Sequence, residues 1–215
     1  MCILDKLEEY LKSTYFLNSD SETVVSLANE IAKDTTNTIE KAVKIFYWTR
    51  DEILYNPYET FTPLKEKNRA SHVISVKKGW CVQKACVLAT LARALGIPSR
   101  LHFADIRNHQ VPEKLKKLMG TDLFVYHGFA ELYLNDHWFN AVPAFNITMC
   151  QKLNLPTVEF DGIDLNKGSL SKTLPNDEMY IEYITDRGVS SDLPLEKIFK
   201  TSEAYYEGLV QSLSF

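Results

Sequence analysis

The stretch Lys78–Arg100, which reads KGWCVQKACVLATLARALGIPSR, decides how the rest of the chain is interpreted. Small and apolar side chains occupy most positions from Val82 to Leu95, so the pattern predicts a helix that is buried on all sides. Gly96 is typical of the position just past a helix, and Pro98 prevents the helix from resuming. The stretch therefore predicts a short loop, a buried helix and a turn into a strand.

Cys81 lies in the first turn of this predicted helix. Free backbone N–H groups and the positive end of the helix dipole favour a thiolate there, which lowers the pKa of a cysteine. The position suits a nucleophile. A free cysteine is nevertheless more often a small buried hydrophobe, which is the interpretation that fits Cys86. Local context alone leaves both interpretations of Cys81 open.

Length and composition predict one globular domain. A chain of 215 residues fits a single core better than two, and its 45% hydrophobic and 24% charged residues are ordinary values. A net charge of −4 argues against partners such as nucleic acid or an anionic membrane. No apolar run approaches the ~20 residues that span a bilayer, and the N-terminus does not resemble a signal peptide.

The cysteines and histidines predict neither a disulfide framework nor a metal site. The four cysteines, at positions 2, 81, 86 and 150, contain no CxxC pair. The five histidines have no HxxxH or HExxH spacing, so we expect no zinc and no cofactor. This cysteine usage predicts a cytoplasmic protein with reduced thiols.

The chain divides into a helical first half and a second half rich in strands, which predicts an α+β fold with an antiparallel sheet. Asn135-Asp136 is typical of a two-residue hairpin turn between two of the strands. We expect helices at 4–17, 22–33, from Thr38 to the break at Asn56-Pro57, at 70–76, 112–119, 147–153 and about 194–209, and strands at 100–106, 124–134, 137–142 and 179–184.

A thiol nucleophile needs a base, and histidine suits that role at neutral pH. His127 is the best candidate, because it lies near the start of the longest predicted strand and Gly128 leaves room beside its ring. Strand alternation would place it on one face with Val125, Phe129 and Glu131. An ordinary sheet histidine fits the spacing equally well. The other histidines lie in polar or loop segments, beside a turn, or too soon after the helix: His72, His109, His137 and His102.

Three features together resemble the transglutaminase-like superfamily, and especially its microbial members described as cysteine proteases. They are Gly79-Trp80-Cys81, the run Arg93–Arg100, and His127 followed by Glu131–Leu134 and Trp138. The resemblance covers about residues 40–145 of one domain, 1–215, between a helical N-terminal part, 1–37, and a C-terminal extension, 146–215.

The resemblance implies a papain-like arrangement, in which Cys81 at a helix N-terminus faces His127 on an antiparallel sheet. It also implies two donors to an oxyanion, which are the backbone N–H of Cys81 and the side chain of Tyr55. A simply packed Tyr55 is the alternative.

The sequence departs from the family where the third member of a triad is expected. The family pattern has an aspartate four residues after the hairpin tryptophan, and here Val142 stands there, before Pro143. Valine cannot accept a hydrogen bond from an imidazole. Asn140 has the right strand parity and is the candidate orienter, with water, a backbone carbonyl or a distant acid as alternatives.

These residues predict an acyl-transfer enzyme that works through a thioester, with hydrolysis favoured over crosslinking. Its substrate would be an amide in a peptide, a protein or a smaller molecule. The alternative is a catalytically impaired peptide- or protein-binding module, which Val142 favours and the Cys81–His127 pair opposes. A redox switch between Cys81 and Cys86 fits less well, because residues five apart on a helix do not face each other. The oligomeric state stays open.

Overall fold

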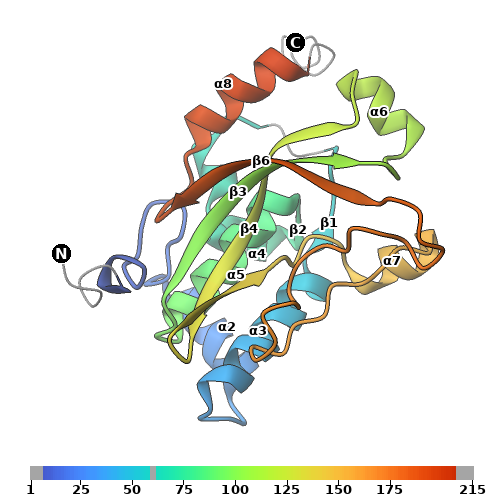
Figure 1. The fold of residues 1–215 in the computed structure, drawn as a ribbon. Helices are drawn as coiled ribbons and strands as arrows, with labels where there is room; N and C mark the ends of the chain where they lie inside the picture. The colour runs from blue at the N-terminus through green and yellow to red at the C-terminus, as the bar shows by residue number, and fades with distance from the viewer. Residues whose placement is uncertain (1–6, 59–61, 207–215) are drawn as a thin grey trace.

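A computed structural model gives the fold and describes residues 7–58 and 62–206. Helices dominate the first half and a four-stranded antiparallel sheet the second, as an α+β fold requires (Figure 1). The elements are α2 (Glu22–Ala32), α3 (Thr38–Glu52), β1 (Leu54–Tyr55), α4 (Ala70–Val76), β2 (Lys78–Gly79), α5 (Cys81–Ala94), β3 (Ser99–Asn108), α6 (Glu113–Met119), β4 (Leu123–Leu134), β5 (His137–Ala141), α7 (Ile147–Leu153), β6 (Ile181–Ser190) and α8 (Leu195–Tyr205), with a 3₁₀ turn at Lys65–Asn68.

The sheet has the strand order β5-β4-β3-β6, and its neighbours pair antiparallel. Helices α2 to α5 lie on one side of it, and α6 and α8 lie near one end (Figure 1). Asn135 and Asp136 turn β4 into β5 with φ of 46° and 65°, the left-handed values that a two-residue hairpin turn needs. The predicted hairpin is therefore confirmed.

Helix α5 is the centre of the molecule, since every residue from Cys81 to Arg93 is buried. It packs against β4 and β3 and against helices α2, α3 and α4. The buried Lys84 ammonium donates to the carbonyls of Arg50 and Ile53 at the end of α3, and burial lowers its pKa to about 7. The helix predicted from residues 82–95 is confirmed, with a charged side chain that ties it to α3.

Three predicted elements differ from the structure because tertiary contacts override local pattern. Of the helix expected at 4–17, only 7–9 is helical among the described residues; the carbonyls of Tyr10 and Lys12 instead accept from Ser99 and Arg93. Helix α3 is capped by Asn37 and ends at Glu52, before the expected break at Asn56-Pro57. The strand expected at 179–184 runs over Ile181–Ser190, because it pairs along most of β3.

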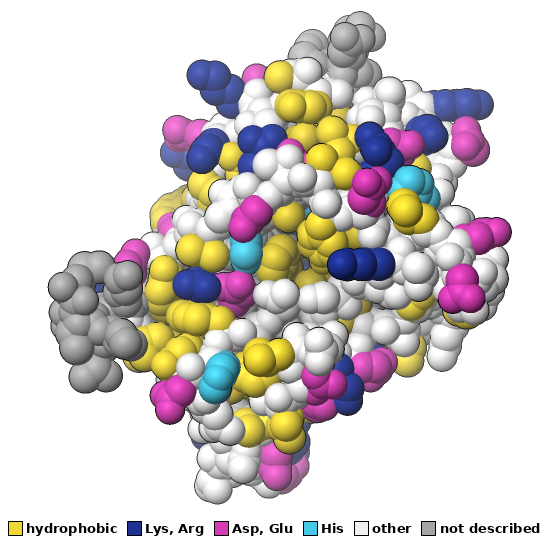
Figure 2. All heavy atoms as spheres, viewed as in Figure 1, with side chains coloured by type: hydrophobic (Ala, Val, Ile, Leu, Met, Phe, Trp, Pro, Cys, Tyr) yellow, Lys and Arg dark blue, Asp and Glu magenta, His cyan; other side chains and the backbone are white. Residues whose placement is uncertain are grey.

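The sheet face that points away from α5 carries a charged cluster around His102. Its Nδ1 lies 2.8 Å from Glu131 and its Nε2 lies 2.8 Å from Asp186, while its ring stacks on Phe129. Arg100 pairs with the other oxygen of Glu131. In the view of Figure 2, charged and histidine side chains stand among apolar ones over this region. Burial lowers the pKa of His102, but the hydrogen bonds to Glu131 and Asp186 outweigh it and raise that pKa.

We predict that this cluster makes stability depend on pH. Because the pKa of His102 is raised in the folded state, its contribution is fully present below its unfolded pKa of ~6.5 and is lost as pH rises through the folded pKa. His102→Gln should therefore cost about 0.5–1 kcal/mol more at pH 5.5 than at pH 8.5 in urea unfolding. His137→Gln, which changes an exposed histidine, is the control. Equal losses at the two pH values would contradict the prediction.

Candidate active site

The loop before α5 is fixed on both sides. Strand β2 pairs in parallel with β1, which places Tyr55 beside Gly79, and the N–H of Asn56 donates to the Gly79 carbonyl. From within α5, the side chain of Gln83 accepts from the Trp80 N–H at 3.4 Å and donates to Lys67 and Asn68. The loop therefore presents Cys81 as the first residue of a buried helix, with its side chain also buried.

A close approach at Gly128 brings β4 to this helix start. A Cβ on Gly128 would lie 2.8 Å from Cγ2 and 3.1 Å from Cα of Val82, closer than real side chains come. Gly128 also supplies a backbone hydrogen bond to the Cys81 thiol. Because Gly128 follows His127 and Val82 follows Cys81, this contact brings the segment of β4 that carries His127 to the helix start that carries Cys81.

A bulge in β4 aims His127. Val125 and Tyr126 both stand opposite Asp105, and Tyr126 has a φ of 54°. Asp105 holds this conformation, since it accepts from the Tyr126 N–H at 3.1 Å and pairs with Arg187 at 2.6 Å. Bulges re-aim side chains. The bulge breaks the strict alternation that the sequence predicted for Val125 and His127.

Cys81 and His127 line one small cavity of about 20 Å³, which holds about one water molecule. Its other walls are largely apolar and come from distant parts of the chain: Tyr55 and Pro57, Trp80, Leu115 and Met119 of α6, Phe124 and Val125, and Tyr206 just past α8. The Tyr206 hydroxyl accepts from the Val125 N–H at 2.6 Å. Cys81 and His127 thus share a narrow, largely apolar cavity.

Burial sets the protonation states in this cavity. It raises the pKa of Cys81 to about 11, although backbone hydrogen bonds from Gly128 and Val82 lower it, and it lowers the pKa of His127 to about 4. Both groups are therefore neutral at pH 7. The lowered pKa that we expected for Cys81 is wrong for this conformation, because desolvation outweighs the helix terminus.

Asn140 does not orient His127. It lies opposite Glu131 in the β4–β5 ladder, four residues from His127 and thus roughly 13 Å away, and its amide donates to Ser169 at 3.1 Å. The Nε2 of His127 is buried and has no hydrogen-bond partner in the described part of the chain. Val142 is buried and directly follows Ala141, the last residue of β5 that pairs with β4; the same register continued by one residue would put it opposite Phe129 and diagonal to His127. An apolar side chain thus stands where a carboxylate was expected.

Tyr55 lines the same cavity as Cys81. Its ring packs edge-on against Phe145 at 4.9 Å, and burial and then the nearby thiol raise its pKa. The structure brings Tyr55 to the site, and its part in binding an oxyanion stays a prediction.

Sequence reasoning missed the residues that close the site. The pattern predicts a helix at 112–119 but no part for it in the site, yet Leu115 and Met119 are buried and line the cavity. Their spacing of four residues was the available signal of an apolar helix face. The sequence contains no signal that places Tyr206 at the site.

Neither a metal site nor a membrane-spanning helix is found within residues 7–58 and 62–206. No group of three or more His, Cys, Asp or Glu side chains could hold a metal ion there. No helix in the same residues is long and apolar enough to cross a bilayer.

The chain belongs to the transglutaminase-like superfamily. The model of that family matches residues 25–143, more than half of the chain. The match begins before residue 40, where we expected the family core to start, and so takes in most of α2. A comparison with curated proteins finds no match.

A solved structure shares the fold. A "putative cysteine protease" from Cytophaga hutchinsonii is 18% identical with a TM-score of 0.53; the match covers 89% of this chain and 50% of that protein. This chain thus corresponds to half the length of that relative. The periplasmic domain of TgpA from Pseudomonas aeruginosa is also 18% identical, with a TM-score of 0.40, over 57% of this chain and 42% of that one.

We predict that the Gly128 contact controls the thiol. Gly128→Ala should force β4 away from Val82, cost about 1–3 kcal/mol in urea unfolding, and alter the rate at which iodoacetamide labels Cys81. Gly188→Ala is the control, since its φ of 80° strains an alanine while nothing lies within contact distance. That control should lose stability but leave Cys81 labelling unchanged. Equal labelling in all three proteins would refute the role of the contact.

We predict that Tyr206 keeps the cavity dry. Tyr206→Ala should admit water to Cys81, lower its pKa from about 11, and speed iodoacetamide labelling at pH 8 by about tenfold. Tyr205→Ala removes the exposed neighbouring ring and should leave the rate unchanged. Mass mapping would assign each label to its cysteine. Unchanged labelling of Cys81 in Tyr206→Ala would show that this ring does not seal the site.

Proposed function

We propose that this protein is a cysteine-dependent acyl-transfer enzyme that hydrolyses an amide bond in a peptide, a protein or a smaller molecule. The observation that carries the proposal is the shared cavity, where a thiol at the start of a buried helix meets a single imidazole. Membership of the transglutaminase-like superfamily supports the same chemistry.

In the proposed reaction the Cys81 sulfur attacks the carbonyl carbon while its proton passes to His127. The imidazolium then gives this proton to the leaving nitrogen, the C–N bond breaks, and an amine departs from a thioester. Water, deprotonated by His127, attacks the thioester; the carboxylic acid leaves and the thiol regains its proton. The backbone N–H of Cys81 and the Tyr55 hydroxyl are the proposed donors to the oxyanion.

The closed cavity must open before this chemistry begins. A thiol with a pKa of about 11 does not pass its proton readily to an imidazole with a pKa of about 4. Both shifts come mainly from burial, so an opening that admits water and substrate brings the two pKa values together. We therefore propose that the described conformation is a resting state.

Hydrolysis is the favoured outcome over crosslinking, because water is always available and no separate amine site is recognisable among the described residues. We place the reaction in the cytoplasm, where the thiol stays reduced.

A second candidate function is a peptide- or protein-binding module that has lost turnover. The unpartnered Nε2 of His127 favours it, because no described residue bonds that nitrogen to hold the imidazole tautomer or stabilise the imidazolium. The two candidates differ in whether His127 speeds covalent chemistry at Cys81.

We predict that p-nitrophenyl acetate acetylates Cys81 in a His127-dependent reaction. His127→Ala should slow acetylation at least about 100-fold, the usual contribution of a general base. Stopped-flow release of nitrophenol and the mass of the protein give the rate and the site. His137→Ala controls for loss of a histidine, and Cys81→Ser for labelling elsewhere. Equal rates in the parent and His127→Ala would favour the binding module.

We predict that a carboxylate at position 142 improves the site. In Val142→Asp the carboxylate should accept from the unpartnered imidazole, raise the pKa of His127 and speed acetylation about tenfold or more. Val142→Leu keeps the position apolar and should not speed it, and the gain should vanish in the double variant with His127→Ala. Thermal unfolding would check that each variant is folded. A folded Val142→Asp without gain would show that the missing orienter does not limit the reaction.

A further inference from the structure

A second, larger pocket adjoins the Cys81 cavity, and we call it the side-chain pocket. It encloses about 220 Å³ and shares Tyr55, Pro57, Leu115 and Phe124 with the cavity around the thiol. A group that fills it would therefore lie directly beside the carbonyl that Cys81 attacks. Its volume is below the ~300–1,000 Å³ of sites for whole drug-sized ligands, so it suits one large side chain.

The outer wall of this pocket comes from beyond the segment that defines the family. Phe145, Met149, Leu153, Leu155 and Tyr180 line it, and all follow residue 143, where the family match ends. The family core thus supplies the thiol and the imidazole, while the extension after it supplies the wall. Part of the pocket is therefore built by residues that lie outside the family match.

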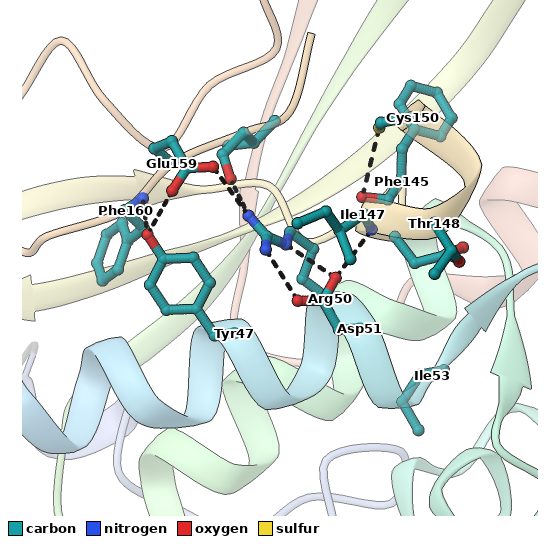
Figure 3. Close-up of polar contacts among 12 residues, drawn as sticks. Tyr47, Arg50, Asp51, Ile53, Phe145, Ile147, Thr148, Cys150, Glu159 and Phe160 are labelled. Atoms are coloured by element: carbon teal, nitrogen blue, oxygen red, sulfur yellow. Dashed lines mark hydrogen bonds and ion pairs between the residues drawn. The ribbon is translucent and has the colours of Figure 1, made fainter. Parts of the chain in front are cut away.

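A polar cluster holds this wall on α3, as Figure 3 shows. Asp51 accepts from the Ile147 N–H at the start of α7 at 2.9 Å. Arg50 donates to the Val158 carbonyl at 2.8 Å and to Glu159 at 3.2 Å. Glu159 also accepts from the Tyr47 hydroxyl at 2.7 Å (Figure 3). The stretch of the wall from Phe145 to Leu155 is therefore anchored on α3 near both of its ends, by contacts that need no substrate.

The chemistry of the lining selects its occupant. Aliphatic and aromatic side chains dominate it, three amide residues (Asn56, Asn108 and Gln110) also line it, and none of the described residues that line it is Asp, Glu, Lys or Arg. A charged side chain would lose its hydration there without gaining a partner of opposite charge. Tyr180 lines the pocket, is fully buried, and its hydroxyl has no hydrogen-bond partner among the described residues. Such a hydroxyl points to a ligand that brings a polar atom with its ring or backbone.

We propose that the side-chain pocket binds an aromatic side chain of the substrate, on the residue that carries the reacting amide. This inference rests on the proposed function. The proposed substrates are peptides with a large aromatic residue at the point of attack, in place of acidic residues.

Protection of Cys81 from iodoacetamide tests the inference without requiring turnover. The probes are the N-acetyl methylamides of phenylalanine, glycine and glutamate, each with an amide on both sides of the side chain. The phenylalanine probe should halve the labelling rate at a concentration at least about tenfold lower than the glycine probe. The glutamate probe should protect no better than the glycine probe.

Two matched variants locate the effect. Met149→Trp fills the pocket and should abolish the preference for the phenylalanine probe, while Gln151→Trp adds the same ring to an exposed position of α7 and should retain it. Equal protection by phenylalanine and glycine probes, or a preference that survives Met149→Trp, would overturn the inference. The proposed function fails separately, when acetylation of Cys81 proves independent of His127.

Discussion

The site depends on one contact, the approach of Gly128 in β4 to Val82 in the first turn of α5. The start of α5 supplies the Cys81 thiol and its backbone donors, and β4 supplies the His127 imidazole. The helix and the strand can approach this closely only because Gly128 has no side chain. Around this contact the bulge at Tyr126 aims His127, and pairing of β1 with β2 sets Tyr55 beside the loop. Tyr55 and Gly128 are 73 positions apart in the sequence, and both lie at Cys81: Tyr55 lines the same cavity, and Gly128 gives the thiol a backbone hydrogen bond.

The packing that brings these groups together also sets their chemistry. A helix N-terminus lowers the pKa of a cysteine by a modest amount, whereas complete loss of water changes a pKa by several units. In this cavity the loss of water is the larger effect on the pKa of both Cys81 and His127. The two side chains are therefore a neutral thiol and a neutral imidazole instead of a thiolate–imidazolium ion pair. Val142 fits this result, because it stands where a carboxylate was expected, and burial is the cause that lowers the pKa of His127. The position of Cys81 and its reactivity are thus set by different neighbours: the contact with Gly128 fixes the position, and the residues that bury the thiol raise its pKa.

Much of the architecture could be predicted from sequence because its signals are local. The apolar run of α5 and the Asn135-Asp136 turn specify their elements without help from distant residues, and the resemblance placed Cys81 and His127 together. The cover over the site could not be predicted, because Tyr206 closes it only through a long-range contact with Val125. Asn140 was the wrong orienter because strand parity fixes a face but not a position along the strand. The sign of the Cys81 pKa shift depends on that same long-range cover.

The cavity of about 20 Å³ has a consequence for the lifetime of the protein. Oxidation of cysteine to sulfenic acid follows the thiolate fraction and the exposure of sulfur. Cys81 is a neutral thiol with 5% of its surface exposed, so peroxide reaches it slowly and finds little thiolate. Burial that slows the reaction with substrate thus also preserves the sulfur between turnovers, and the nucleophile becomes vulnerable to oxidants only while the site is open.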